Sequence, residues 1–364
     1  MAAPFAEQLL IWYLQKRADL PWRRDPSPYQ VWLSEIMLQQ TRVKAVIPYY
    51  ERFIGAFPTI EALAAAPLHD VLKLWEGLGY YSRARNLHRA AHIIVSEHGG
   101  QLPSDVQALR ELPGIGPYSA GAIASIAFGR PVPVLDGNVI RVFARLLDLD
   151  EDISQSATRE KLWRVADDWL PAGDAGVYNQ ALMELGQRVC RPQNPRCELC
   201  PIRSHCRAWS AGTQSQRPRR AKRPPTPHYD VTAGLIRDDQ ERLLIAQRPL
   251  DGLLGGLWEF PGGKVEAGET LADCLQRELR EEMAIAVEVV GLFAVVDHAF
   301  THFKITLHAF DCRYRGALPP HDEPQALGVR AWAWVVDAQL ADYSFGKADR
   351  LVIDELARRR AMLL

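Results

Sequence analysis

The sequence predicts two folded parts, an all-α half followed by an α+β half. At 364 residues the chain exceeds what one hydrophobic core usually serves. Apolar residues recur at helical spacing to about residue 210, whereas later segments alternate or run apolar over strand lengths. We therefore expect a helical domain over 1–210, a linker over 211–228 and an α+β domain over 229–364.

The composition is that of an ordinary globular protein, with 48% apolar and 24% charged residues. The formal net charge is -1, so any binding to nucleic acid must depend on local basic patches. No apolar run is long enough to predict a membrane span. The N-terminal stretch lacks a basic segment ahead of its apolar residues and reads as an amphipathic helix, not a signal peptide.

Helical periodicity in the first half is interrupted by glycines at plausible helix ends, Gly77, Gly79 and Gly99. Further on, the segment "LPGIGPYSAGAIASIAFG" (112–129) places Gly114 and Gly116 in a tight turn before a helix. The free amides and the positive end of that helix make an anion site. This arrangement is typical of a helix–hairpin–helix, which holds the DNA backbone without reading sequence, although plain helix–helix corners also contain glycine.

Four of the six cysteines fall within residues 190–206, with the spacing C-x6-C-x2-C-x5-C. Soft thiolates suit zinc or an iron–sulfur cluster. Zinc sites usually contain two closely spaced pairs and this segment contains one, so the compact loop favours a cluster. Unliganded thiols remain an alternative. A disulfide framework would be unusual in a long chain without a secretion signal, so we expect a reducing, cytoplasmic setting. The four are Cys190, Cys197, Cys200 and Cys206.

The stretch "GTQSQRPRRAKRPPTPHY" joins the two halves and has four prolines and no apolar periodicity. Its positive charge either contacts a phosphate backbone or belongs to a solvated hinge. The basic residues are Arg217, Arg219, Arg220, Lys222 and Arg223.

The second half predicts strands at "VTAGLI", "RLLIAQR", "HFKITLHAF" and "AWAWVV", with helices at 270–283 and 346–360. Within it, "GGKVEAGETLADCLQRELREEMAI" (262–285) resembles the signature of the Nudix hydrolases, which cleave nucleotide pyrophosphates with bound magnesium. Three carboxylates on one helical face, Glu278, Glu281 and Glu282, suit such a cation, although an acidic helix face can simply be solvated.

One position departs from the Nudix pattern, because Ala284 stands where the second glycine is expected. A glycine there can supply a positive φ that alanine adopts only with strain. The hydrolase reading is weakened accordingly.

The cysteine spacing, the hairpin and the following "LDGN" together resemble the endonuclease III superfamily of DNA glycosylases. The resemblance implies a 4Fe–4S cluster on the four cysteines and a catalytic role for Asp136. Alone, Asp136 would be read as a helix cap. Superfamily members with lyase activity have a lysine where this chain has Tyr118, and neither Tyr118 nor Ser119 forms a Schiff base, so we expect base removal without efficient strand cleavage.

Within that superfamily, "VWLSEIMLQQTRVKAVIPYY" (31–50) and the appended Nudix-like domain resemble the adenine DNA glycosylases of the MutY type. The resemblance implies removal of adenine opposite 8-oxoguanine or guanine in double-stranded DNA. Glu35 would protonate the base, which requires a raised pKa in apolar surroundings. Asp136 would stay ionised and stabilise the sugar cation, with Asn138 orienting it and Tyr118 contacting the sugar.

The same resemblance implies further contacts to DNA. Arg23 and Gln180 would hold the extruded adenine, and Trp22 would line that pocket or belong to the core. Gln40 and Tyr80 would be wedged into the duplex, although Tyr80 could instead be a packed aromatic. The hairpin residues Gly114, Gly116 and Ser119 would contact the backbone, and the loop Phe300, Thr301 and His302, similar to the family's Phe-Ser-His loop, would contact the oxidised guanine.

Four functions compete on this sequence. The leading one is a monofunctional adenine glycosylase in base excision repair. The others are an endonuclease III-like glycosylase with lyase activity, a pyrophosphatase for an 8-oxo-dGTP-type nucleotide with a DNA-binding N-terminal half, and a non-catalytic DNA sensor. For the first we expect a cytoplasmic monomer that associates with the nucleoid through DNA.

Overall fold

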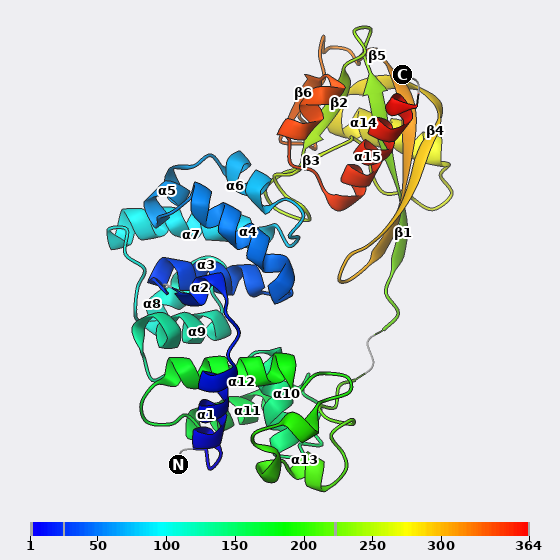
Figure 1. Ribbon diagram of the computed structural model, residues 1–364. Helices are drawn as coiled ribbons and strands as arrows, with labels where there is room; N and C mark the ends of the chain where they lie inside the picture. The colour runs from blue at the N-terminus through cyan, green and yellow to red at the C-terminus, as the bar shows by residue number, and fades with distance from the viewer. Residues whose placement is uncertain (1–2, 25, 222–223, 363–364) are drawn as a thin grey trace. The chain divides into compact units, whose positions relative to one another are not determined.

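The computed structural model describes residues 3–24, 26–221 and 224–362 (Figure 1). The chain divides into two compact units. The first comprises residues 1–66 and 86–223, and the second comprises residues 67–85 and 224–364. Each unit has its own hydrophobic core and is described by itself.

The first unit is all-helical where the structure describes it, as predicted. Its central core combines residues of α1, α9, α10, α11 and α12. α7 begins among residues of the second unit and continues in the first. The helices are α1 (Ala6–Lys16), α2 (Pro21–Arg24), α3 (Pro28–Leu38), α4 (Val43–Ala56), α5 (Ile60–Ala65), α7 (Ser82–His98), α8 (Val106–Glu111), α9 (Pro117–Phe128), α10 (Gly137–Leu146), α11 (Ser156–Asp168), α12 (Ala175–Arg188) and α13 (Arg207–Ser210), with short 3-10 turns η1 (Cys197–Leu199) and η2 (Arg203–His205).

The predicted hairpin lies between α8 and α9. Gly114 has φ +82°, and a Cβ atom there would lie 2.9 Å from Cβ of Asn86, so only glycine fits without rearrangement. Gly116 caps α9 and Pro117 opens it, where a missing amide hydrogen is no loss. The turn therefore presents the N-terminus of α9 at the surface of the first unit.

α10 begins where Asp136 caps it. The Asp136 carboxylate accepts hydrogen bonds from the backbone amides of Asn138 (2.9 Å) and Val139 (2.7 Å). The capping reading of this aspartate is thus correct, and capping fixes the carboxylate at the helix start. Both amides donate to the same oxygen, Oδ1.

The start of the expected linker is anchored to the helical unit. Arg217 is buried and forms ion pairs with Asp148 and Asp150, both at 2.9 Å, and Arg219 also pairs with Asp150. Thr213 donates to Asp148 at 2.6 Å. Arg217 is thus buried and paired and does not belong to a solvated hinge, whereas Arg219 pairs with Asp150 at the surface. Lys222 and Arg223 lie outside the described residues.

The second unit contains a six-stranded sheet in the order β3-β2-β1-β5-β4, with β6 paired to β2. β1 and β5 are parallel and the remaining pairs are antiparallel. The strands are β1 (His228–Arg237), β2 (Leu243–Gln247), β3 (Trp258–Glu259), β4 (Ile285–Ala299), β5 (Lys304–Ala317) and β6 (Ala331–Val335). The unit also contains α6 (Leu68–Trp75), α14 (Leu271–Met283), η3 (Asp337–Asp342) and α15 (Lys347–Ala361).

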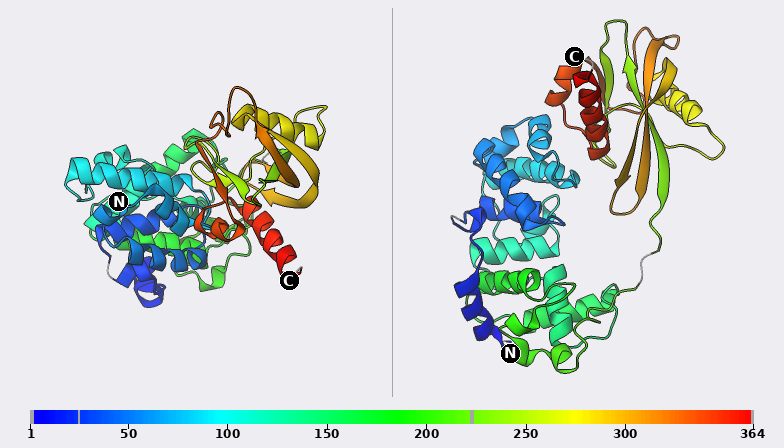
Figure 2. Two further views of the ribbon diagram at one scale, coloured as in Figure 1. Left: turned by 90° about the horizontal axis from the view of Figure 1, so that it is seen from above. Right: turned by 45° about the vertical axis from the view of Figure 1, so that its right-hand side comes forward.

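Figure 2 shows α14 and α15 on opposite faces of this sheet. Each face has its own core: α14 contributes Leu275 and Leu279 to one, and α15 contributes Ala348 and Val352 to the other. The predicted α+β architecture is confirmed. Across residues 3–24, 26–221 and 224–362, no helix combines the length and apolarity that crossing a bilayer requires.

Candidate active site

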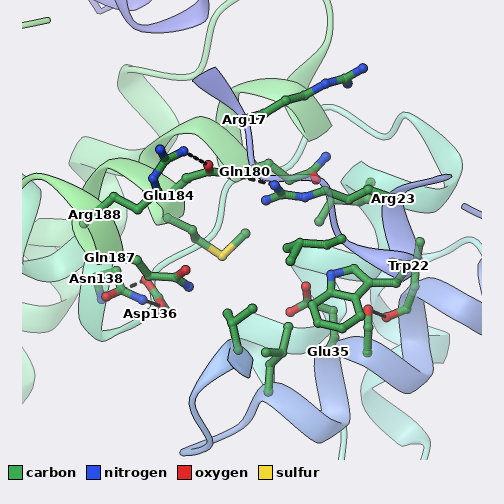
Figure 3. Close-up of a pocket in the computed structure, with 18 of the residues that line it drawn as sticks. Arg17, Trp22, Arg23, Glu35, Asp136, Asn138, Gln180, Glu184, Gln187 and Arg188 are labelled. Carbon is green, nitrogen blue, oxygen red and sulfur yellow. Dashed lines mark hydrogen bonds and ion pairs between the residues drawn. The ribbon is translucent and has the colours of Figure 1, made fainter. Parts of the chain in front are cut away.

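A cavity of about 990 Å³ opens in the first unit between α2, α3, α9, α12 and the start of α10 (Figure 3). In this view Glu35 lies on one side of the cavity, near Trp22, and Asp136 lies on the other, next to Asn138. Eight residues singled out in the sequence line it: Trp22, Arg23, Glu35, Gln40, Tyr118, Asp136, Asn138 and Gln180. The fold thus brings together carboxyls that are far apart in the chain.

Glu35 is a buried acid because α3 is buried on nearly all sides. Its side chain is carried into the core among apolar neighbours, and the residue is 7% exposed. Burial raises the pKa of Glu35 to about 7, the hydrogen bond from Tyr118 opposes that rise, and the nearby charge of Asp136 adds to it. Near neutral pH, Glu35 therefore retains its proton in a large fraction of molecules.

Tyr118 is tied to this acid. Its hydroxyl donates to Oε2 of Glu35 at 2.8 Å and lies 3.1 Å from Sδ of Met183. Sequence reasoning assigned Tyr118 to the sugar, and the structure adds a hydrogen bond with the acid itself. The burial of Tyr118 and its two carboxyl neighbours raise the pKa of the phenol well above 10, so it remains a donor.

Asp136 differs from Glu35 in its hydrogen bonds. Besides the two backbone amides, Nδ2 of Asn138 donates to Oδ2 at 2.6 Å. Burial raises the pKa of Asp136, and the hydrogen bonds from Val139 and Asn138 oppose that rise. Three donors favour the charged form, which is the form that can face a developing positive charge.

Arg141 fixes the orientation of Asn138 and was missed in the sequence. Its Nη2 donates to Oδ1 of Asn138 at 2.9 Å, which directs the amide nitrogen toward Asp136. Its Nε donates to the carbonyl of Cys190 at 2.7 Å, and Nη2 also reaches the carbonyl of Gly186. The i+3 spacing from Asn138 on α10 was the available signal.

Glu184, which sequence reasoning also missed, lines the same cavity. Glu184 is 3% exposed and pairs with Arg23 and Arg188, both at 2.7 Å, while accepting from the amide of Ala18. Gln180 lies one helical turn earlier, and its Oε1 accepts from the hydroxyl of Tyr13 at 3.2 Å. The i+4 spacing in "NQALMELG" could have indicated the pair.

Gly114, Gly116 and Ser119 are absent from the cavity lining, to which the adjoining Tyr118 contributes. Ser119 instead accepts a hydrogen bond at Oγ from Nε2 of Gln39, at 3.1 Å. The neighbouring Gln40 is exposed and has φ +57°, a conformation that non-glycine residues adopt rarely. Such backbone strain is characteristic of functional loops.

The four cysteines are half-buried, and Cys190, Cys200 and Cys206 pack against the core of the first unit. Nη1 of Arg145 lies 3.2 Å from Sγ of Cys190, and burial raises the pKa of Cys200 to about 12. A guanidinium beside half-buried thiols favours their thiolate form, and thiolates are donors for soft metal ions. Within the described residues no three His, Cys, Asp or Glu side chains converge closely enough to hold a single metal ion.

In the second unit, Arg277 collects the carboxylates of the Nudix-like box. It pairs with Glu269 at 2.6 Å, Glu278 at 3.0 Å and Glu281 at 3.1 Å. Burial and the charge of Glu278 raise the pKa of Glu282. Three of the four acids thus share one guanidinium.

The residues predicted to contact the lesion lie in the same unit. The hydroxyl of Tyr80 is 2.9 Å from Oγ1 of Thr301, and Tyr80 has φ +51°. Phe300 stacks on Phe303 at the tip of the β4–β5 hairpin, and His302 is exposed. Tyr80 is therefore an exposed aromatic, not a packed one.

Two family models match the chain: HhH-GPD superfamily base excision DNA repair protein over residues 33–167 and NUDIX domain over residues 232–355. The chain is 37% identical to the adenine DNA glycosylases of Rattus norvegicus and Homo sapiens, over 86% of its length and 71% and 68% of theirs. A thermostable thymine-DNA glycosylase structure matches 57% of this chain and 95% of that one, at 27% identity and a TM-score of 0.51. The chain therefore belongs to the adenine DNA glycosylase family.

Proposed function

We propose that this chain removes adenine from double-stranded DNA where adenine is mispaired with 8-oxoguanine or guanine, in base excision repair. The observation that carries the proposal is the pair of carboxyls in one cavity. Glu35 is buried and holds a proton near pH 7, while Asp136 accepts three hydrogen bonds that favour its charge. The related proteins are named adenine DNA glycosylases, which supports adenine as the base that is removed.

The chemistry follows from this division. Glu35 gives its proton to a ring nitrogen of the extruded adenine, and the electron pair of the N-glycosidic bond leaves with the base. The carboxylate of Asp136 stabilises the positive charge that develops at C1′ of the sugar. Water then adds to C1′, and the proton it releases restores Glu35. Tyr118 offers no amine for a Schiff base, which separates this mechanism from glycosylase–lyase chemistry.

The adenine pocket is proposed at the Glu184 end of the cavity. Arg23 and Gln180 present donors and acceptors there, and both are held in place, Arg23 by Glu184 and Gln180 by Tyr13. Gln40 and Tyr80 are proposed as wedges in the duplex, since both are exposed and carry left-handed backbone strain.

A 4Fe–4S cluster fits the four cysteines, by their spacing, their shared half-buried position and the guanidinium of Arg145 at Cys190. When bound, such a cluster supplies a structural cross-link and negative charge. Arg141 and Arg145 lie on α10 and donate to carbonyls of the cysteine-containing loop. They would then fix this loop, which holds the cluster, against α10.

For the second unit we propose recognition of 8-oxoguanine through Phe300, Thr301 and His302. A magnesium-dependent nucleotide hydrolase at Glu278, Glu281 and Glu282 is the other candidate. Arg277 binds two of these carboxylates, which favours a structural role for the box. The proposed organisation remains a glycosylase domain over 1–210, a linker over 211–228 and a recognition domain over 229–364.

The test is release of free adenine from a duplex with adenine opposite 8-oxoguanine. The unsubstituted protein should release it, and Glu35→Gln and Asp136→Asn should each abolish release. Release that survives in the double variant would refute the assignment. Incubation with 8-oxo-dGTP and magnesium distinguishes recognition from hydrolysis, because recognition predicts no pyrophosphate.

A further inference from the structure

A second cavity, of about 680 Å³, adjoins the catalytic one within the first unit. It lies between the start of α10, α11 and residues 215–220. Asp136 and Asn138 line both cavities, as do Arg141 and Pro192. The second cavity thus begins at the catalytic aspartate, and the proposed reaction leaves it without a role.

The lining of this cavity is strongly basic. Its ionisable side chains are one acid, Asp136, and the four arginines Arg141, Arg159, Arg217 and Arg220. An anion is therefore the ligand class that its charge selects.

The four arginines divide into two pairs. Arg141 and Arg217 are buried and committed, the first to carbonyls and Asn138 and the second to Asp148 and Asp150. Arg159 and Arg220 are exposed at the rim. Arg217 and Arg219 form the ion pairs beside this cavity. Among the described residues, neither Arg159 nor Arg220 takes part in one.

The rim residues keep donors available. Arg159 uses its Nε on the carbonyl of Ile153 at 3.3 Å, which leaves its terminal nitrogens for a ligand. The charge of Arg220 contributes to lowering the pKa of Asp152, and among the described residues no hydrogen bond from the Arg220 guanidinium is recorded. A guanidinium offers two parallel N–H groups, the geometry that matches phosphate oxygens.

There is also room for a backbone to approach. Gly137, the first residue of α10, faces open space, since a Cβ atom built there would meet nothing within 4 Å.

We propose that this cavity binds a phosphodiester of the reacting strand, directly beside the extruded nucleotide, through Arg159 and Arg220. The inference rests on the proposed function, which places the sugar of that nucleotide against Asp136. The sugar of the extruded nucleotide is joined to one phosphate on each side. Asp136 also lines the second cavity, so that cavity lies next to one of these phosphates in the proposed complex. Arg159 and Arg220 would then hold the strand in register with Glu35 and Asp136 without reading its sequence.

The first experiment measures the affinity of the full-length holoprotein for a duplex in which a non-cleavable 2′-fluoro-adenosine faces 8-oxoguanine. Arg159→Ala and Arg220→Ala should each weaken binding roughly three- to tenfold and lower the slope of log Kd against log salt by about one. Arg164→Ala is the matched control, because Arg164 is exposed on the same helix and does not line the cavity. It should change neither quantity.

The second experiment replaces the phosphates around the reacting nucleotide one at a time with neutral methylphosphonates. A methylphosphonate at one phosphate next to the reacting nucleotide should weaken DNA binding by the unsubstituted protein and by Arg164→Ala. In the Arg159→Ala/Arg220→Ala double variant, the same methylphosphonate should cause no further loss of affinity. Equal losses at every position in all variants would overturn the assignment.

A third arm uses inorganic phosphate alone. Phosphate binding that is lost in the double variant, without any coupling to a methylphosphonate, would assign the cavity to a free anion and overturn the strand assignment. Adenine release by the unsubstituted protein is measured in parallel. Its absence would refute the proposed function, whereas release without methylphosphonate coupling would refute the phosphate site alone.

Discussion

The hydroxyl of Tyr118 donates a hydrogen bond to Oε2 of Glu35 across 2.8 Å, inside the cavity that also contains Asp136. A donor stabilises a carboxylate more than a carboxylic acid, so Tyr118 limits how far burial raises the pKa of Glu35. The phenol therefore tunes the acid that the proposed reaction requires to be protonated.

Replacing Tyr118 with phenylalanine should shift the pH dependence of adenine release. Without the donor, the pKa of Glu35 rises, so the protonated form persists to higher pH. The alkaline limb of the single-turnover rate should move upward by about one pH unit, as expected for loss of one hydrogen bond to a charged group. An alkaline limb that stays in place, in a variant that still binds DNA, would contradict this role for the hydroxyl.

Glu35→Gln should make the protein more stable at alkaline pH while removing activity. The pKa of Glu35 is about 7 in the folded chain and 4.5 is its ordinary value, so its contribution to stability is full below pH 4.5 and is lost as the pH rises toward 7. Glutamine does not titrate. The free energy of unfolding of the variant should exceed that of the unsubstituted protein by about 3 kcal/mol at pH 8. The difference should vanish near pH 4, and urea titrations at both pH values measure it.

Arg141 should act as a positioning residue for Asp136. Removing its guanidinium frees the amide of Asn138 to rotate and leaves the carbonyl of Cys190 without its donor. Arg141→Gln should slow the single-turnover rate about tenfold to hundredfold with little change in the Kd for the mispaired duplex. Arg141→Lys should recover part of the rate. A loss in DNA binding equal to the loss in rate would instead indicate a general structural defect, and iron content monitors the cysteine loop.

The hairpin and the cysteines could be predicted because each belongs to a local pattern with fixed spacing, whereas the two carboxyls were assigned through the resemblance to a known family. Roles that depend on partners distant in the chain could not be predicted from the sequence. Arg217 reads as a linker charge until the fold places it against Asp148 and Asp150. Glu184 reads as one more helical acid until Arg23 reaches it from the far end of the chain.

The sequence analysis also did not predict the long strand β4, and the reason is different. Its pairing with β5 shifts register at three places, between Ile285 and Val287, between Val289 and Gly291, and between Leu292 and Ala294. At the second and third shifts the extra residue lies in β4, so the following side chains of β4 move to the other face. This breaks the two-residue alternation by which strands are recognised. The strands β1 and β2 of the same sheet keep runs of buried residues and were predicted.

Ala284→Gly should stabilise the chain. Ala284 ends α14 in the left-handed conformation, with φ +52°, and its amide bonds to the carbonyls of Leu279 and Arg280. Alanine is strained there and glycine is not, so the variant should gain about 0.5–1 kcal/mol in the urea transition of the full-length protein. Ala357→Gly, at an exposed position inside α15, is the matched control and should lose about 1 kcal/mol. If Ala284→Gly were as destabilising as the control, the left-handed cap would not be strained by alanine, and the departure from the Nudix pattern would need another explanation.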